Sequence, residues 1–202
     1  MSLVLISFWL SATTPTFEVP SVDYSATAQI QLDSNSMNGT LYSAQGPIRF
    51  DYQQNERNFS LVYSLAGKSA WLRIPSEKIQ FKIQLNPSEL NAAFAPMGTW
   101  LEIRPTGKAT IHSVPVQQYK VLFREKSGAI YRGTVSISSQ KIIIQIQLRL
   151  ESKPKNVQGI PKKFNLELSR LKVEPLNKNL FVISESYKTL DLDSLLGAIG
   201  PK

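Results

Sequence analysis

Cysteine is absent from the 202 residues, and histidine occurs once, as His112. The lack of thiols excludes disulfide frameworks, thiolate zinc sites, cysteine nucleophiles and iron–sulfur clusters. One histidine cannot build a histidine-based metal site. A Ser-His-Asp triad would also need a serine on a sharp G-x-S-x-G turn, which the sequence does not contain. We therefore expect a surface or turn histidine, no metal, no catalytic residues and no enzyme.

Glycine and negative charge are also scarce. None of the ten glycines belongs to a G-x-G-x-x-G or Walker pattern, so the sequence predicts no phosphate-binding loop and no cofactor. The 15 Asp and Glu residues are outnumbered by 23 Lys and Arg residues, which gives a net charge of +8. A basic surface favours anionic partners such as nucleic acid, acidic lipid headgroups or acidic proteins, and solubility alone is the simpler explanation.

No hydrophobic run has the length of a transmembrane helix. A short apolar run at residues 3–10, followed by Ser11 and Ala12, is typical of the hydrophobic part of a secretory signal peptide, although the usual Lys or Arg before it is missing. We expect a signal peptide at residues 1–12, a lead-in at 13–22 and a single domain at 23–202. The alternative is that the run is an ordinary first strand.

What the chain does contain is a two-residue alternation of apolar and polar side chains. It is clear in "YSATAQIQL" (24–32), in "NFSLVYSL" (58–65) and in "KIIIQIQLRLE" (141–151). This period is typical of half-buried strands, and the regular short spacing predicts an antiparallel meander. Asn38-Gly39 is either a competing hairpin turn or a bulge inside the second strand.

Two segments interrupt the alternation. "AWLRIPSEKIQFKI" (70–83) has two alternating runs on either side of an Ile-Pro-Ser-Glu-Lys corner. "NPSELNAAFAPMG" (86–98) carries helix-start residues, with Asn86 as the cap and Pro87 in the first turn, so we expect a short helix there. Residues 99–117 look like a crossover, after which "QQYKVLFRE" begins a second strand series.

Three motifs in this order resemble the DUF4412 family, which is similar to the LolA/LolB/LppX-like superfamily of lipoprotein-localisation factors. The first is "AWLRIPSEKIQF", with Trp71, Pro75, Lys78 and Phe81 at the family's Trp, Pro, Lys and aromatic positions. The second is "GKATIHSVPVQQYKV", in which Val-Pro replaces a usual glycine. The third is "LKVEPLNKNLFVISESYK", in which two serines replace the usual Pro and Gly. The resemblance covers about residues 24–190.

The resemblance implies a mainly β (α+β) fold, in which a strongly curved antiparallel sheet forms an unclosed β-barrel capped by short helices. Relatives of that fold carry acyl chains or lipoproteins, or anchor at the envelope, and the family has no catalytic residues to transfer. A curved sheet of this kind leaves a concave apolar face, which makes a core when filled and a lipid slot when partly open.

The candidate lining residues are those expected on the concave face and on the helical lid. They are Ile30, Leu32, Phe50, Phe59, Leu61, Tyr63, Trp71, Phe81, Ile144 and Ile146, with Phe94 and Met97 on the lid. Each can equally be an ordinary core residue. A basic rim is expected from the cations around one loop, namely Arg149, Lys153, Lys155, Lys162 and Lys163. This cluster is either a solvated loop or a peripheral contact with an anionic membrane surface.

The sequence thus favours an exported, monomeric envelope protein in the periplasm that binds a lipid or a lipidated protein in the concavity. A structural or interaction module that pairs a sheet edge with an envelope protein is the alternative. A nucleic-acid binder is not expected, because aromatic residues are not interleaved with the basic ones on an exposed face.

Overall fold

The computed structural model describes residues 16–64, 69–84, 98–156, 158–183 and 185–191. Strands account for nearly all of its regular structure, and the only helices in the described ranges are two short 3-10 turns, η1 and η2. The elements are β1 (Asp23–Leu32), β2 (Asn35–Ala44), β3 (Ile48–Gln54), β4 (Arg57–Ser64), β5 (Ser69–Ile74), η1 (Pro75–Glu77), β6 (Ile79–Gln84), β7 (Gly98–Ile111), β8 (Val114–Glu125), β9 (Ile130–Ser138), β10 (Ile143–Ser152), β11 (Lys163–Val173), η2 (Lys178–Phe181) and β12 (Lys188–Asp191).

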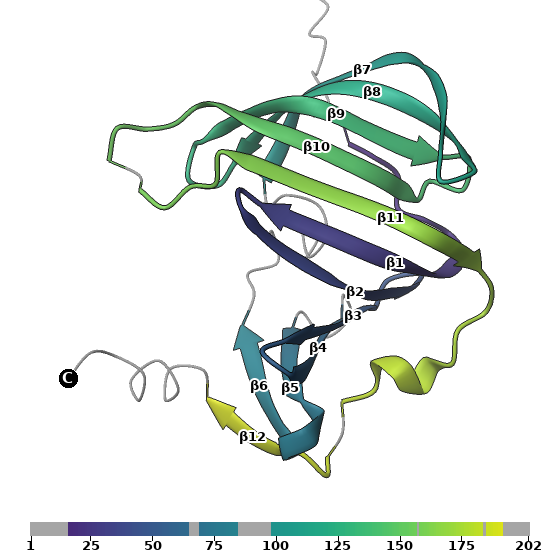
Figure 1. Cartoon of the computed structure of the whole chain (residues 1–202), viewed down its shortest axis with the longest axis vertical. Helices are drawn as coiled ribbons and strands as arrows, with labels where there is room; N and C mark the ends of the chain where they lie inside the picture. Colours follow the sequence, from purple (N-terminus) through teal and green to yellow (C-terminus); the bar gives the residue numbers. More distant parts are fainter. Residues whose placement is uncertain (1–15, 65–68, 85–97, 157, 184, 192–202) are drawn as a thin grey trace, which may run out of the picture.

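All twelve strands belong to one sheet, in the order β12-β6-β5-β4-β3-β2-β1-β11-β10-β9-β8-β7. Two meanders, β1 to β6 and β7 to β11, are joined where β1 pairs with β11, and every neighbouring pair is antiparallel except β12 with β6. The sheet twists strongly, so the directions of β5 and β6 are steeply inclined to those of β10 and β11 (Figure 1). It does not close into a barrel, and β7 and β12 are its ends. The predicted fold class is confirmed.

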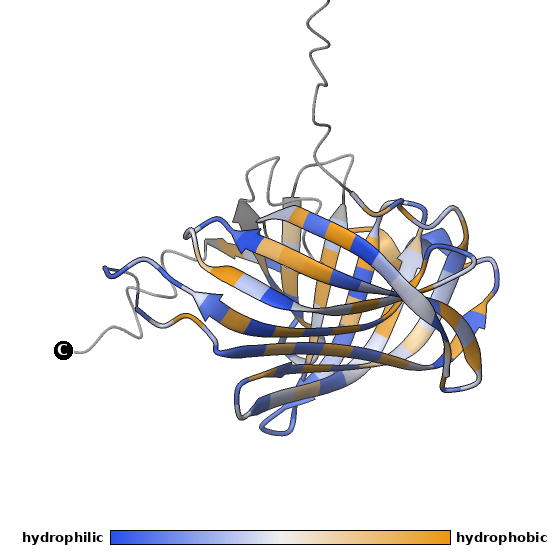
Figure 2. Ribbon diagram, turned by 90° about the horizontal axis from the view of Figure 1, so that it is seen from above, coloured by the Kyte–Doolittle hydropathy of each residue, from blue (hydrophilic) through white to orange (hydrophobic). Residues whose placement is uncertain are grey.

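One face of the sheet, here called the inner face, holds the core. In β1 the buried residues are Tyr24, Ala26 and Ala28, and Ile30 follows on the same side. Hydrophobic and hydrophilic residues alternate along most strands (Figure 2). A single cluster of buried side chains extends from β1–β3 to the inner faces of β7–β11. The two-residue period therefore sends apolar side chains to the inner face and polar ones to the opposite, outer face.

Gly39 lies in the middle of β2, opposite Ala28 and Tyr52 in unbroken register. It is thus neither of the features expected, a hairpin turn or a bulge. A Cβ at this position would lie 2.2 Å from the carbonyl oxygen of Asp51 and 2.8 Å from the ring of Phe50. The glycine allows this aromatic ring to lie directly on the strand, since no side chain intervenes.

The corner at residues 74–79 has the predicted form. β5 ends at Ile74, η1 follows with Pro75 in its first turn, and β6 begins at Ile79. Lys78 closes the turn with φ of 52°, and its N–H donates to the carbonyl of Pro75. Because proline presets φ and the left-handed residue reverses the chain, the two alternating runs pair as an antiparallel hairpin.

The crossover expected at residues 99–117 is wrong, because residues 98–125 form two long paired strands. They form a hairpin in which β7 and β8 pair along their whole length, through a two-residue turn at His112 and Ser113. Both turn residues have positive φ, the backbone that normally selects Asn-Gly. Register shifts at Trp100/Glu102 and Pro105/Gly107 also break the alternation of apolar and polar residues, so this strand cannot be recognised from the two-residue period.

The tip of this hairpin folds back over the outer face of the sheet. His112 lies in the exposed turn, as expected, and its Nε2 is 2.6 Å from Oε1 of Glu167 on β11, three strands away from β8. Gln145 donates to the other carboxylate oxygen of Glu167 at 3.0 Å. Val116 has the sequence parity of Gln118 and Lys120 on β8, yet it is 3% exposed and belongs to the core cluster.

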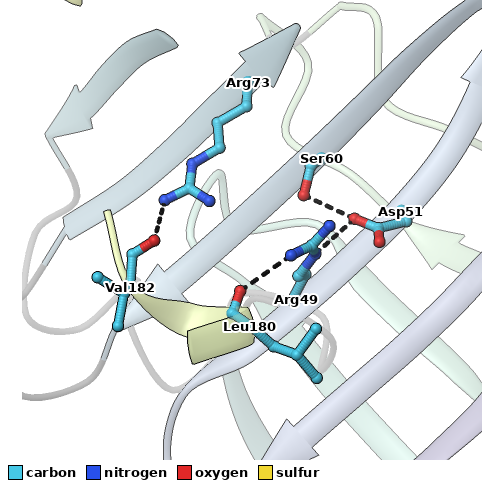
Figure 3. A network of polar contacts seen from close by, with 6 residues as sticks. All are labelled: Arg49, Asp51, Ser60, Arg73, Leu180 and Val182. Atoms are coloured by element: carbon cyan, nitrogen blue, oxygen red, sulfur yellow. Dashed lines mark hydrogen bonds and ion pairs between the residues drawn. The ribbon is translucent and has the colours of Figure 1, made fainter. Parts of the chain in front are cut away.

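A C-terminal strap, defined as residues 174–183 and 185–191, crosses the outer face of the other half of the sheet (Figure 3). Its η2 turn lies against β3 and β4. Arg49 donates from Nη1 to the carbonyl of Leu180 at 3.1 Å, and Arg73 donates from Nη2 to the carbonyl of Val182 at 2.5 Å. The strap ends as β12, which pairs with β6.

The strap buries polar residues that alternation alone would place in solvent. Arg73 is 6% exposed and Gln80 is 3% exposed, although both point outward. Gln80 donates to the hydroxyl of Thr189, and the guanidinium of Arg73 lies 5.9 Å from the ring centroid of Tyr187. Burial, followed by the charge of Arg49, lowers the pKa of Arg73. The strap therefore covers part of the outer face of β4–β6 and provides polar and aromatic partners for the residues it buries.

The expected helix at 86–98 lies almost entirely outside the described residues, as do the lid residues Phe94 and Met97 and the expected signal peptide. Only Gly98 of the helix segment is described, as the first residue of β7.

Replacing Arg73 with Met is expected to lower the free energy of unfolding by about 1–3 kcal/mol, because the strap loses the hydrogen bond from this buried guanidinium to the carbonyl of Val182. Chemical denaturation measures the change, and limited proteolysis reports cleavage within the strap. Arg57→Met is the control: this arginine is exposed and its ion pair with Glu77 is loose, so about 0.5 kcal/mol or less is expected. An Arg73→Met protein as stable as wild type would show that the strap does not depend on this contact.

The hydrogen bond from His112, and then that from Gln145, lowers the pKa of Glu167 below its ordinary value of 4.5. The carboxylate therefore contributes stability above about pH 4.5, and this contribution is lost as the pH falls through the lowered pKa. Because both side chains are partly exposed, the contribution is below about 1 kcal/mol. The stability difference between wild type and Glu167→Gln, followed by urea denaturation against pH, should shrink on acidification. A difference that grows on acidification would contradict this.

Candidate functional site

One apolar row crosses seven strands on the inner face. Each of its residues is directly opposite the next in the sheet register. From β1 to β12 the row is Ala26, Leu41, Phe50, Leu61, Leu72, Phe81 and Leu190. Directly opposite residues in a sheet have Cβ atoms about 5 Å apart, so the row is a continuous hydrophobic strip. It is the longest uninterrupted apolar feature built by β1–β6 and β12.

A stack of three aromatic rings lies beside this row. The ring centroids of Phe50 and Tyr52 are 5.3 Å apart at 16°, and those of Tyr52 and Phe59 are 5.3 Å apart at 17°. The stack runs over Gly39, whose missing side chain makes room for it. Burial raises the pKa of Tyr52, which keeps its phenol neutral. The strip thus has a rigid aromatic border towards the β3–β4 turn.

The register brings most of the predicted lining residues to this one face. Five of them are almost fully covered by protein, namely Phe50, Tyr63, Phe81, Ile144 and Ile146. Four retain partial exposure, namely Ile30, Leu32, Phe59 and Leu61. These four residues lie on β1 and β4, and Leu72 of the strip on β5 is partly exposed as well. In the β7–β11 half the predicted residues belong to the closed core.

Trp71 was expected to line the concave face, but it lies on the opposite face of the sheet. It is opposite Val62 and Lys82, whereas Tyr63 is opposite Ala70. Trp71 therefore lies on the outer face, where the ammonium of Lys82 is 5.8 Å from its ring centroid. The sequence already indicates this, because Trp71 is two residues from Arg73 and so shares its face, whereas the adjacent Leu72 points to the other face.

The lead-in fills part of the inner face of the β7–β8 hairpin. The ring of Phe17 meets Trp100 edge-on with centroids 5.1 Å apart, and it meets Tyr119 at 5.5 Å. Trp100 in turn packs on Phe123 at 4.9 Å. This aromatic group completes the core on that side, which the sequence did not reveal because its members come from three separate segments.

Tyr63 carries a polar group into this apolar face. It is 1% exposed, and its hydroxyl has no hydrogen-bond partner among the residues that the structure describes. Desolvation by burial raises the pKa of Tyr63 to about 12, so the hydroxyl is a neutral donor. Its neighbours across the register are Ile48 and Ala70, neither of which has a side-chain acceptor. Tyr24, which lies in the same register row on β1, by contrast forms a hydrogen bond with the hydroxyl of Ser43.

The predicted basic rim divides between two places. Arg149 and Lys163 are opposite each other on the outer face, so they point away from the apolar strip. Lys153, Lys155 and Lys162 are exposed in the β10–β11 loop. That loop is tied to the sheet: Tyr131 donates to the carbonyl of Pro161, and the Asp33 carboxylate accepts from the N–H groups of Lys162 and Lys163.

Within the described ranges, no group of three or more His, Cys, Asp or Glu side chains is placed to hold a metal ion. Helices in the same ranges lack the length and apolarity needed to cross a bilayer.

No family model matches the chain, and no curated protein matches it either. Among solved structures, an uncharacterized conserved protein from Thermus thermophilus overlays with a TM-score of 0.53 at 11% identity, covering 85% of this chain and 91% of that one. At this identity the likeness shows the fold alone.

Two weaker overlays involve the MucA/MucB complex of Pseudomonas aeruginosa and a domain from Vibrio parahaemolyticus described as outer membrane lipoprotein-sorting. The first has a TM-score of 0.41 at 8% identity, covering 85% of this chain and 59% of that one. The second has a TM-score of 0.39 at 10% identity, covering 79% and 89%. The chain thus spans about three fifths of MucB.

Replacing Tyr63 with Phe is expected to leave the free energy of unfolding unchanged or to raise it by about 1 kcal/mol. The substitution removes a buried hydroxyl without a partner in the described part of the chain, and with it the cost of desolvating that group. Thermal and urea denaturation of the two proteins measure the difference. A loss above about 1 kcal/mol would mean that the hydroxyl is satisfied within the fold.

Proposed function

We propose that this protein is a non-enzymatic, exported envelope protein that binds a lipid, or the acyl chain of a lipoprotein, against the inner face of β1–β6. The observation that carries the proposal is the apolar strip itself, which remains partly exposed at Leu61 and beside it at Phe59 and Ile30.

The energetics of such a site come from apolar burial. Each methylene removed from water contributes about 0.8 kcal/mol, so an acyl chain lying along the strip gains affinity with its length. The strip runs across strands, from β1 towards β12, and strands are about 4.8 Å apart. A chain that crosses several strands therefore has enough length to cover many methylenes.

The hydroxyl of Tyr63 supplies the polar end of the proposed site. It is a buried donor with no partner in the described ranges, and Tyr63 lies one register row away from Leu61 and Phe50. An ester or carboxylate oxygen of a bound amphiphile is an acceptor that would satisfy it. Such a pairing combines a largely apolar surface with one placed polar group, which is the usual composition of a small-molecule site.

Membership in the LolA-like superfamily, and within it in the DUF4412 family, is part of the same proposal. It rests on the three sequence motifs and on the unclosed sheet that they predicted. Export to the periplasm belongs to it as well, and rests on the apolar run at residues 3–10.

Partnership with an envelope protein is the second candidate function. Strand β7 is one end of the sheet and is 14 residues long, so an extended segment of a partner could pair with it. Two register shifts, together with Pro105 and Lys108, protect the middle of this edge against such pairing. The first candidate is therefore preferred.

Titration of the delipidated full chain with a fluorescent fatty acid tests the lipid proposal. We expect one ligand per chain at micromolar concentration. Leu61→Asp should weaken binding at least tenfold, because it places a charge within the strip. Tyr63→Phe should weaken it about two- to tenfold through the loss of one hydrogen bond.

Val19→Asp is the matched control, because Val19 is 71% exposed and lies outside the strip. Circular dichroism confirms that each variant is folded. Absence of uptake by the wild-type protein, or equal weakening by Leu61→Asp and Val19→Asp, would rule out the inner face as the binding site.

A further inference from the structure

The outer face of the β7–β11 half gathers positive charge from residues far apart in the sequence. Its members all point outward by register, and all are exposed. They are Arg104 on β7, Lys120 and Arg124 on β8, Arg132 on β9, Arg149 on β10 and Lys163 on β11. This set is called the outer basic face. Only Arg149 and Lys163 belonged to the predicted basic rim, because the other four are isolated in the sequence.

The register places like charges directly opposite one another. Arg104 faces Lys120 across β7–β8, Arg132 faces Arg149 across β9–β10, and Arg149 faces Lys163 across β10–β11. Such pairs have Cβ atoms about 5 Å apart and destabilise a sheet. The three neighbouring strands β9, β10 and β11 thus carry an unbroken row of cations, which folding alone does not favour.

Few acidic groups compensate for this charge. Glu102 pairs with Arg104 at 2.8 Å, and Glu151 pairs with Arg132 through two contacts of 3.0 Å. The remaining members, Lys120, Arg124, Arg149 and Lys163, form no ion pair with any residue in the described part of the chain.

We propose that the outer basic face docks the protein on the surface of an anionic phospholipid bilayer. Free guanidinium and ammonium groups on a broad, solvent-exposed sheet complement closely spaced lipid phosphates, and arginine binds phosphate with two parallel hydrogen bonds. The inner face is on the other side of the same strands, so docking and acyl binding use separate surfaces. This inference therefore goes beyond the proposed function and does not depend on it.

The side chains on this face favour a membrane over other anionic partners. The outward positions of β8–β10 hold no aromatic residue, so bases of a single-stranded nucleic acid find no stacking platform. A protein interface needs a buried apolar or aromatic centre, and only Leu122 and Ile130 are apolar among the cations. A bilayer surface needs only charge.

Co-sedimentation of the full-length protein with vesicles tests the proposal. Phosphatidylcholine vesicles with phosphatidylglycerol are compared with pure phosphatidylcholine, at about 50 mM and about 500 mM NaCl. We expect binding to the anionic vesicles only, and its loss at high salt. Each Lys or Arg near an anionic surface strengthens binding about fivefold. The triple variant Lys120→Gln/Arg124→Gln/Arg149→Gln should therefore bind about a hundredfold more weakly.

The matched control removes three exposed cations from the other half of the sheet: Lys82→Gln/Lys178→Gln/Lys188→Gln. It has the same net charge as the first variant and should keep most of the vesicle binding. Equal losses in the two variants would show that net charge acts without the outer basic face. Failure of wild type to bind anionic vesicles would overturn the proposal, as would tighter binding to double-stranded DNA at the same salt concentration.

Discussion

The antiparallel pairing of β1 with β11 is the constraint on which the rest of the structure depends. It joins two meanders that run outward in opposite directions, and it fixes their registers relative to each other. A slip of one residue at this junction would turn one strand over relative to the other, so that either Ala28 or Leu168 would face outward. Both residues are buried, so the hydrophobic effect selects one register, and that register makes the inner face continuous across the sheet.

The outer face has different roles in its two halves. Over β3–β6 the C-terminal strap covers the outer face. Arg49 and Arg73 donate hydrogen bonds to carbonyl groups of the strap there. Over β8–β11 cations such as Arg149 remain exposed and outside any ion pair of the described residues. The same alternation places arginine and lysine outward on both halves. These residues bind the strap over β3–β6, whereas they form an exposed charged surface over β8–β11. The position of the strap makes the difference.

Alternation alone was sufficient to predict the strands, their inner faces and residues such as Ile30, Leu61 and Phe81 at the candidate site. It failed at β7–β8, where His112-Ser113 replaces the usual turn residues and two bulges break the period. Trp71 lies on the outer face because it is an odd number of residues from Leu72, although its hydrophobicity favours the inner face. The burial of Arg73 depends on the strap around Val182, more than a hundred residues away. The lack of a partner for the Tyr63 hydroxyl among the described residues depends on the strands around it. Neither leaves a pattern in the local sequence.

The central claim is that the inner face of β1–β6 holds an acyl chain in the native setting. Native mass spectrometry of the protein purified from its own host, without detergent or denaturant, tests it most directly. The account predicts a population heavier than the polypeptide by the mass of a lipid, and loss of that mass on organic extraction. A protein found only at its own mass, or one bound to another polypeptide through a sheet edge, would contradict it.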